Sequence, residues 1–229
     1  AVLSELPPQA SSKAFVDALL PVDGVSRRVV RDVALVVGFS LFMVLLARLS
    51  IHLPFTPVPI TGQTLGVLLT GAALGSWRGA AAMALYLVEG SQLSVYAGGS
   101  SDYIWQLASG DFIFGFTSGA SGLFWNMASG GYLIGFIPAA FLVGYLCEHG
   151  WDRKVWIILA MLAGNVMLYL PGLLQLSFFV PNDKVFEYGL YPFILGDLVK
   201  LYMASLIVPL AWGLLDRRRG GGGTWILPG

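Results

Sequence analysis

Two charged residues, Asp197 and Lys200, lie three positions apart within an apolar stretch that runs from position 192 to position 215. On a helix, residues three apart project from the same side, so the two side chains should share one environment. A charged side chain at the centre of a membrane helix costs about 2.5–3.5 kcal/mol on insertion scales, and such residues usually face a cavity or a partner. Two interpretations stay open: a polar site that receives a ligand's hydrogen bonds, and a salt bridge that only neutralises itself.

The composition is that of an integral membrane protein. Of the 229 residues, 56% are hydrophobic and 11% are charged, whereas soluble proteins carry about 25% charged residues. The formal net charge is zero, which argues against a nucleic-acid partner. We therefore expect an all-α integral membrane fold.

The apolar stretches predict six transmembrane helices, which cover residues 29–50, 63–76, 79–96, 131–147, 155–180 and 192–215. They form a predicted membrane domain, 29–216, between a cytoplasmic segment, 1–28, and a flexible cytoplasmic tail, 217–229. Residues 11–20 are predicted either as a short interfacial helix or as part of a disordered tail. Residues 97–130 contain no lysine or arginine and are predicted as a long external loop that could act as a lid.

A proline-rich segment before the second predicted helix supplies a second candidate binding element. Pro54, Pro57 and Pro59 cannot continue a helix, and non-helical backbone at membrane depth must be buried in protein or line a cavity. Gln63 follows this segment, and its amide can both donate and accept a hydrogen bond. We predict Gln63 either as a ligand contact or as a cap of the helix that begins there.

Two further pairs of residues share a helix face. Tyr86 and Glu89 lie three positions apart on the third predicted helix. Glu89 is predicted either as a second carboxylate of the pocket or as a residue at the wet end of its helix. Ala34 and Gly38, on the first predicted helix, are small residues that let another helix approach closely.

The basic residues orient the predicted helices. One set of helix ends carries Arg27, Arg28, Arg31, Arg78, Arg153, Lys154, Arg217, Arg218 and Arg219. The opposite set carries His52, the loop without basic residues, Asp183, Lys184 and Glu187. Cytoplasmic ends of membrane helices carry an excess of lysine and arginine. We therefore expect a multi-pass plasma membrane protein with both termini in the cytoplasm.

Catalytic motifs are absent from the sequence. It contains no GxxxxGK[ST], HExxH, CxxC or GxSxG motif, so nothing nominates a nucleophile, a metal site or ATP binding. No stripe of polar residues repeats along several helices, which argues against a channel. These absences favour a protein that is not an enzyme and that binds and passes a small solute.

Four blocks of the sequence resemble the BioY proteins, the biotin-binding S-components of energy-coupling-factor (ECF) transporters. They are FTPVPITGQTLGVLLTGAALG (55–75), YAGG (96–99), SGGYLIGF (129–136) and PFILGDLVK (192–200). The first block is the most specific, and all four occur in the family's order. One departure is the family's usual GLPVFAGG, which reads QLSVYAGG here and alters that wall of the expected pocket.

The resemblance implies a six-helix S-component fold with a biotin pocket near the extracytoplasmic side and no cofactor. The family's polar pocket positions fall on Gln63, Tyr132, Asp197 and Lys200, with a third-helix contact at Tyr86 or Glu89. The resemblance also implies partners: a transmembrane coupling protein, which docks on Ala34 and Gly38, and two ATPases, which alone use ATP.

The chemistry of biotin agrees with these residues. Its ureido ring offers two N–H donors and one carbonyl acceptor, and its side chain ends in a carboxylate. A buried aspartate can accept from an N–H, and a lysine can neutralise a carboxylate. Two alternatives stay open: an S-component for another vitamin, and a membrane scaffold in which Asp197 and Lys200 only join helices.

Overall fold

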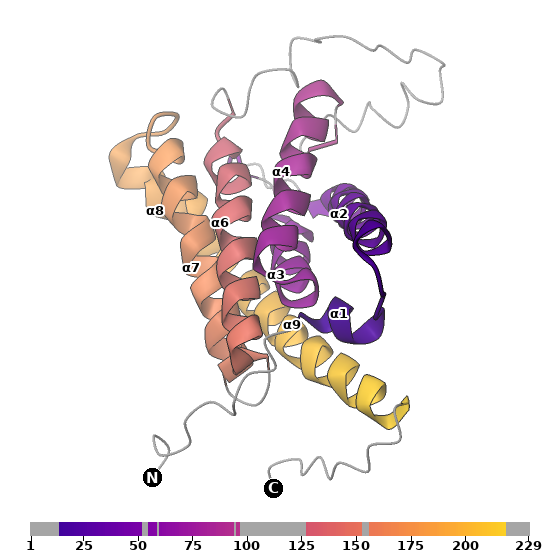
Figure 1. The fold of residues 1–229 in the computed structure, drawn as a ribbon. Helices are drawn as coiled ribbons and strands as arrows, with labels where there is room; N and C mark the ends of the chain where they lie inside the picture. The colour runs from indigo at the N-terminus through magenta and orange to yellow at the C-terminus, as the bar shows by residue number, and fades with distance from the viewer. Residues whose placement is uncertain are drawn as a thin grey trace, which may run out of the picture.

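The computed structural model describes residues 14–51, 55–58, 60–93, 95–96, 127–152 and 156–218. In this part of the chain, six helices pack into one bundle (Figure 1). They are α2 (Val25–Arg48), α3 (Gln63–Leu74), α4 (Ser76–Gln92), α6 (Gly130–Leu146), α7 (Trp156–Leu176) and α9 (Tyr191–Arg218). The bundle confirms the predicted all-α fold.

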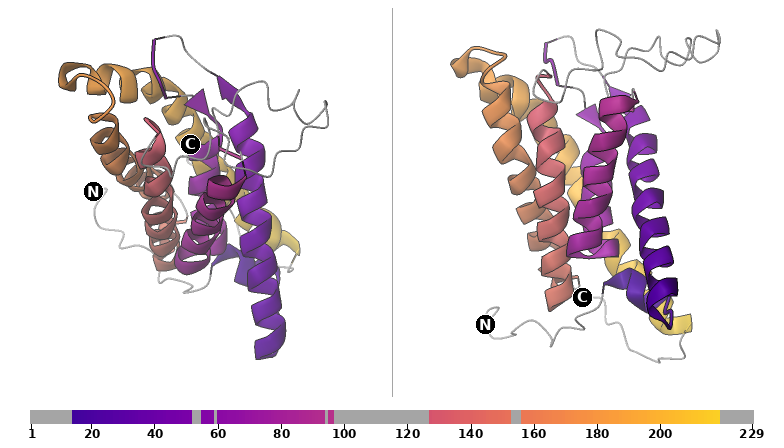
Figure 2. Two further views of the ribbon diagram at one scale, coloured as in Figure 1. Left: turned by 90° about the horizontal axis from the view of Figure 1, so that it is seen from above. Right: turned by 45° about the horizontal axis from the view of Figure 1, so that its top comes forward.

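Short elements connect the bundle helices. Helix α1 (Phe15–Leu19) precedes α2, and the π-helical turn η2 (Cys147–Trp151) continues α6. Strand β1 (Ser50–Ile51) pairs antiparallel with β2 (Ile60–Thr61), with Ser50 opposite Thr61. The 3₁₀ turn η3 (Asn182–Lys184) and helix α8 (Val185–Gly189) lie between α7 and α9. Figure 2 shows the strands and α8 at one end of the bundle and α1 at the other.

The six helices differ in length. Among the described residues, four segments are long and apolar enough to cross a membrane: Val25–Arg48, Gly130–Trp151, Trp156–Leu176 and Asn182–Leu215. Helix α4 has 17 residues, and α3 has only 12. At ~1.5 Å per residue, α3 is about 18 Å long, which is shorter than the ~30 Å hydrocarbon core of a bilayer. Helix α3 therefore does not span such a core by itself.

The junction between α3 and α4 differs from the predicted one. The sequence pattern placed Trp77 and Arg78 between the two helices, but the single residue Gly75, with a φ of +83°, separates them. Glu148 stabilises the early start of α4: it accepts hydrogen bonds from the backbone N–H of Ser76 at 3.0 Å and from the Ser76 hydroxyl at 2.8 Å. Glu148 lies 72 residues away in the chain, so the local sequence carries no sign of this cap.

Helix α3 lies at the centre of the bundle, against α2, α4, α6 and α9. Two of its glycines permit this close packing. A Cβ atom at Gly71 would lie 2.5 Å from the carbonyl oxygen of Ala140, and one at Gly66 would lie 2.5 Å from a methyl group of Leu46. The contact at Gly71 is with backbone and leaves no room for a side chain, whereas a side chain at Gly66 would require the flexible side chain of Leu46 to shift. The first turn of α3 is thereby held in the interior.

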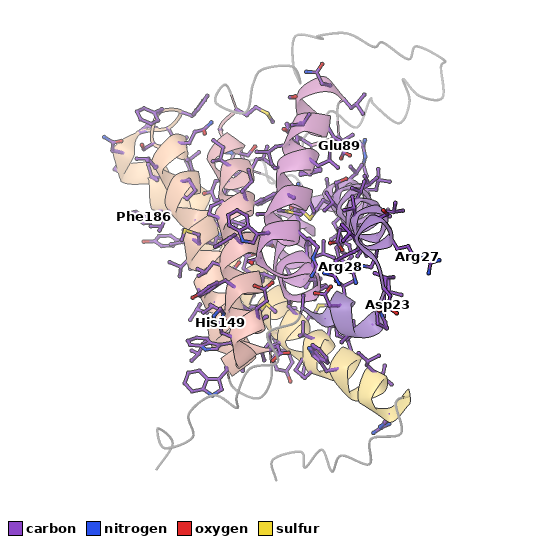
Figure 3. All side chains as sticks on the ribbon, viewed as in Figure 1. Asp23, Arg27, Arg28, Glu89, His149 and Phe186 are labelled. Carbon is purple, nitrogen blue, oxygen red and sulfur yellow. The ribbon has the colours of Figure 1, made fainter. Side chains whose placement is uncertain are left out.

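A cluster of charged residues joins the elements at the α1 end of the bundle. Arg31 contacts Asp17 at 2.8 Å and Asp32 at 2.7 Å. Arg78 donates to Asp17 at 2.8 Å and to Asp32 at 3.1 Å. The cluster ties α1 to the N-terminal parts of α2 and α4. Arg27 and Arg28, which are exposed, lie near Asp23 at the start of α2 (Figure 3).

We predict that this cluster makes the protein sensitive to acid. The hydrogen bond from Arg78 and the charges of Arg78 and Arg31 hold the pKa of Asp17 below its ordinary value of 3.8. The stabilisation from ionised Asp17 is present above pH 3.8 and is lost as the pH falls through the lowered pKa. Thermal unfolding in detergent between about pH 6 and pH 3 should show a smaller loss of melting temperature for Asp17→Asn than for the parent protein.

The control for this experiment is Asp23→Asn, which changes an exposed carboxylate near the same end. It should lose melting temperature on acidification as the parent does. Identical pH profiles for Asp17→Asn and the parent would contradict a stabilising role of the cluster.

Candidate functional site

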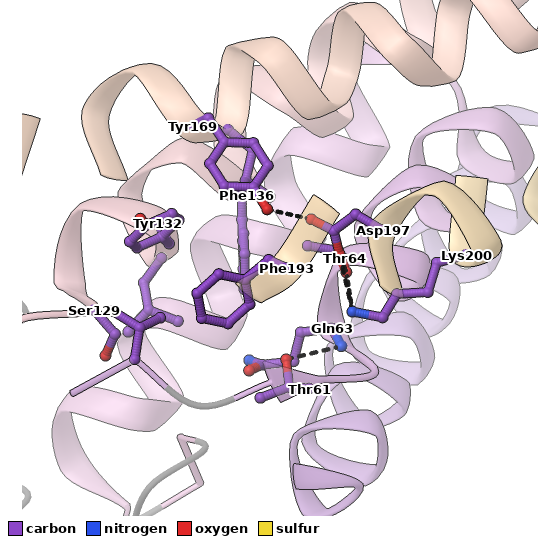
Figure 4. A pocket seen from close by; sticks show the side chains of 13 residues that line it. Thr61, Gln63, Thr64, Ser129, Tyr132, Phe136, Tyr169, Phe193, Asp197 and Lys200 are labelled. Atoms are coloured by element: carbon purple, nitrogen blue, oxygen red, sulfur yellow. Dashed lines mark hydrogen bonds and ion pairs between the residues drawn. The ribbon is translucent and has the colours of Figure 1, made fainter. Parts of the chain in front are cut away.

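A cavity lies between α3, α6, α7 and α9, near the end of the bundle that carries the strands and α8 (Figure 4). Its lining combines an apolar wall with a small number of polar side chains. The lining residues are Val58, Thr61, Gln63, Thr64, Ser129, Tyr132, Leu133, Phe136, Leu168, Tyr169, Phe193, Asp197 and Lys200. Such a mixture is typical of small-molecule sites, in which apolar groups bury the ligand and a few polar groups orient it.

Asp197 and Lys200 face this cavity from α9. The Lys200 ammonium lies 3.0 Å from Asp197 Oδ1 and donates to the hydroxyl of Thr64 at 2.9 Å. The Thr64 hydroxyl in turn donates to Asp197 Oδ1 at 3.1 Å. The side chains of Asp197 and Lys200 are 7% and 16% exposed. The two residues therefore form an ion pair, and the pair borders the cavity rather than the outer surface of the bundle.

Tyr169 of α7 is a functional candidate that sequence reasoning missed. Its hydroxyl donates a hydrogen bond to Oδ2 of Asp197, and its ring meets that of Tyr132 edge to face at a centroid distance of 5.7 Å. The only signal in the sequence is a hydroxyl-bearing aromatic residue in an apolar helix. Its contact with Asp197 spans 28 residues of chain, so no local spacing indicates it.

The hydrogen bonds of Asp197 and Lys200 leave an acceptor position and a donor available to a ligand. An ionised carboxylate has about four acceptor positions, and Asp197 accepts three bonds, from Thr64, Lys200 and Tyr169. An ammonium group has three N–H donors, and Lys200 uses two of them. Among the described contacts, one acceptor position on Asp197 and one donor on Lys200 are therefore available to a bound molecule.

Gln63 lines the cavity from the first turn of α3 and is 3% exposed. The side chain makes no cap of its helix. Its Nε2 group instead donates to the hydroxyl of Tyr86 at 2.7 Å. The side chain of Gln63 thus contacts Tyr86 and not the end of its own helix, and its contact with a ligand stays a prediction.

Tyr86 and Glu89 do not line this cavity. Tyr86 is fully buried and lies behind Gln63, where its hydroxyl donates to the carbonyl of Val95 at 3.3 Å. Glu89 accepts a hydrogen bond from Ser40 of α2 at 2.9 Å, on the α2 side of α4 (Figure 3). Tyr86 can reach a ligand only through Gln63, and Glu89 joins two helices.

The rest of the lining is aromatic and aliphatic. Tyr132 lines the cavity from α6, as the sequence motif predicts, and its hydroxyl donates to the carbonyl of Gly189 at 2.7 Å. The rings of Phe136 and Phe193 are 3% and 6% exposed and supply flat apolar surfaces. The described residues include no group of three or more histidine, cysteine, aspartate or glutamate side chains that could hold a metal.

Ala34 and Gly38 lie apart from the cavity, on the outer face of α2. Both are exposed, and a Cβ atom at Gly38 would have no atom of the chain within 4 Å. Around them the apolar side chains of Val33, Val37 and Leu41 are 58%, 41% and 57% exposed. The face is therefore open to lipid or to another helix.

Comparison with solved structures defines the class of fold. The crystal structure of the S-component for biotin from an ECF-type ABC transporter matches with a TM-score of 0.64 and 24% sequence identity. The match covers 88% of this chain and 97% of that chain. At this identity the match shows the fold, a multi-pass helical membrane protein of the S-component type.

Sequence comparison defines the family. A model of the BioY family matches residues 14–121 and 113–217. The biotin transporter BioY of Rhizobium etli is 34% identical over 204 residues, 82% of this chain and 98% of that protein. Its counterparts in Thermotoga maritima and Rhodobacter capsulatus are each 34% identical, over 162 and 187 residues. The chain belongs to the BioY family, whose members are transporters and not enzymes.

We predict that Tyr169→Phe destabilises the protein. The variant keeps the ring but removes the hydrogen bond to Asp197, and a bond to a charged group is worth about 1.5–3 kcal/mol. The free energy of unfolding should fall by about 1–2 kcal/mol, as measured by denaturant titration in detergent.

The matched control is Tyr202→Phe, which removes a hydroxyl from a tyrosine of α9 that is 61% exposed. It should change the free energy of unfolding by less than about 0.5 kcal/mol. Equal stability of Tyr169→Phe and the parent would show that this bond adds nothing to the site.

Proposed function

We propose that this chain binds biotin at the cavity and delivers it for import through an ECF-type transporter. The observation that carries the proposal is the Asp197–Lys200 ion pair, which borders a partly open, mostly apolar cavity in a BioY-family fold. A pair that only neutralised itself would need no such space. The crystallised S-component of similar fold is one for biotin, and the named relatives are biotin transporters, which supports the same ligand here.

The polar groups of biotin match those that the cavity offers. Asp197 has an acceptor position for a ureido N–H, and Gln63 carries a second acceptor oxygen. Lys200 has a free N–H for the ureido carbonyl or for the carboxylate of the side chain. The bicyclic ring and alkyl chain are apolar and suit contact with Phe136 and Phe193, which line the cavity.

The charge distribution supports an extracytoplasmic opening. Arg31 and Arg78 contact Asp17 of α1, and α1 lies at the end of the bundle opposite the strands (Figure 2). Cytoplasmic ends of membrane helices are rich in arginine and lysine. We therefore place segment 1–28 and the tail 217–229 in the cytoplasm, and the membrane domain 29–216 with its cavity toward the outside. The predicted loop 97–130 lies outside the described residues apart from 127–130, and the tail beyond 218 lies outside them too.

The outer face of α2 is our proposed docking site for the transmembrane coupling protein. Ala34 and Gly38 leave a shallow exposed strip between larger apolar side chains, and small residues let two helices approach closely. Two ATPases, bound to the coupling protein, would supply the energy, because the chain carries no phosphate-binding loop of its own.

Substitution of the ion pair tests the ligand site. Asp197→Asn and Lys200→Ala should each weaken biotin binding by about 1–3 kcal/mol, because each leaves a buried polar group of the ligand without its charged partner. Calorimetry on detergent-purified protein measures the affinity directly. Matched controls are Asp183→Asn and Lys184→Ala, which remove the same charges from the turn between α7 and α8 and should leave the affinity unchanged.

Two results would count against the assignment. Parent-like affinity in both Asp197→Asn and Lys200→Ala would remove the ion pair from the binding site. Displacement of labelled biotin by thiamin, riboflavin or pantothenate at equal concentration would point to an S-component for another vitamin.

Gly38→Leu tests the docking face separately. A bulky side chain in the exposed strip should abolish co-purification of the coupling protein while biotin affinity stays that of the parent, since Gly38 lies away from the cavity. Gly213→Leu, at a similarly open position on α9, is the control and should retain the partner. Normal co-purification with Gly38→Leu would move the docking site elsewhere.

A further inference from the structure

The orientation of the Gln63 side-chain amide determines which of its polar groups faces the cavity. A glutamine amide carries an N–H₂ donor and a carbonyl acceptor on opposite sides. Which of the two faces the cavity decides whether this end of the site accepts an N–H from a ligand or donates to an oxygen. The surroundings of the amide behind the cavity settle its orientation.

A chain of hydrogen bonds behind Gln63 ends on a backbone carbonyl. The carbonyl oxygen of Val95 can only accept. The Tyr86 hydroxyl has a single proton and donates it to that oxygen at 3.3 Å. The oxygen of Tyr86 is then left as an acceptor, and Gln63 Nε2 donates to it at 2.7 Å. One of the two N–H groups of Gln63 is thereby used on Tyr86, which turns the amide nitrogen toward Tyr86 and leaves the carbonyl oxygen Oε1 for the cavity.

Packing keeps Tyr86 in this arrangement. Tyr86 is 0% exposed, and its ring meets Tyr96 edge to face at 5.6 Å and stacks on Phe136 at 6.5 Å. Reversal of the Gln63 amide would place its oxygen against the Tyr86 oxygen. The hydroxyl would have to turn toward Gln63 and leave the carbonyl of Val95 without this donor, which is costly in a buried place.

We propose that Tyr86 is a positioning residue for substrate selection. By holding the Gln63 amide with Oε1 toward the cavity, it makes this end of the site an acceptor for a ligand N–H and unfavourable for a carboxylate. The inference rests on the proposed function, because one ureido N–H of biotin supplies the donor. Asp197 supplies a second acceptor, so the cavity presents two acceptors to the two N–H groups of one ring.

Two biotin analogues test the orientation of the amide. In each, one or the other ureido N–H is replaced by a ring oxygen, which removes a donor without adding bulk. Equilibrium competition with labelled biotin on purified protein gives the affinities. The parent protein should bind at least one analogue about tenfold more weakly than biotin, as expected for a lost buried hydrogen bond.

Tyr86→Phe is the decisive variant. It frees the amide of Gln63 to turn, so the penalty for one analogue should fall to about twofold while the penalty for the other stays. Gln63→Met removes the acceptor altogether and should abolish the penalty for the same analogue. Tyr86→Phe alone still tests the orientation of the amide if Gln63→Met fails to fold.

The matched control is Tyr96→Phe. Its hydroxyl donates to the carbonyl of Leu87 and not to Gln63, so the selectivity between biotin and the analogues should remain that of the parent. Equal weakening of biotin and both analogues by Tyr86→Phe, or no selectivity in the parent, would overturn the positioning role. Failure of the parent to bind biotin at all would instead contradict the proposed function.

Discussion

A buried ion pair is stable only when every partner that water would have supplied is replaced by the protein. Asp197 meets this constraint through three donors, Thr64, Lys200 and Tyr169, from three different helices. These helices must therefore meet at one depth, and the cavity lies where they meet. The same hydrogen bonds that make the pair tolerable in the membrane leave one acceptor and one donor for a ligand.

Helix α3 allows α3, α7 and α9 to come together around Asp197 because it is short and lies at the centre of the bundle. Its glycines bring it against its neighbours, and its first turn delivers Thr64 to Asp197 and Gln63 to Tyr86. Between α6 and α7, Gly135 approaches the carbonyl oxygen of Leu168, with a Cβ–oxygen distance of only 2.7 Å were a side chain present. That approach sets Tyr132 beside Tyr169. Close backbone contacts at glycines thus determine where the polar side chains lie.

The sequence predicted which residues share a face within one helix, but it did not predict which residues of different helices are in contact. The spacing of Asp197 and Lys200 indicates a shared face because it depends only on helix geometry. The role of Tyr169 and the indirect role of Tyr86 depend on partners distant in the chain. The start of α4 at Ser76 was likewise misplaced, because its cap comes from Glu148. Family resemblance nominated Gln63 and Tyr132, but it could not indicate the hydrogen bond between Gln63 and Tyr86.

The structure of the purified protein with biotin bound tests the central claim most directly. The account predicts that one polar end of biotin lies within hydrogen-bond distance of both the Asp197 carboxylate and the Lys200 ammonium, inside the cavity between α3, α6, α7 and α9. Biotin bound elsewhere, with Asp197 and Lys200 still in contact only with each other and with Thr64 and Tyr169, would contradict it.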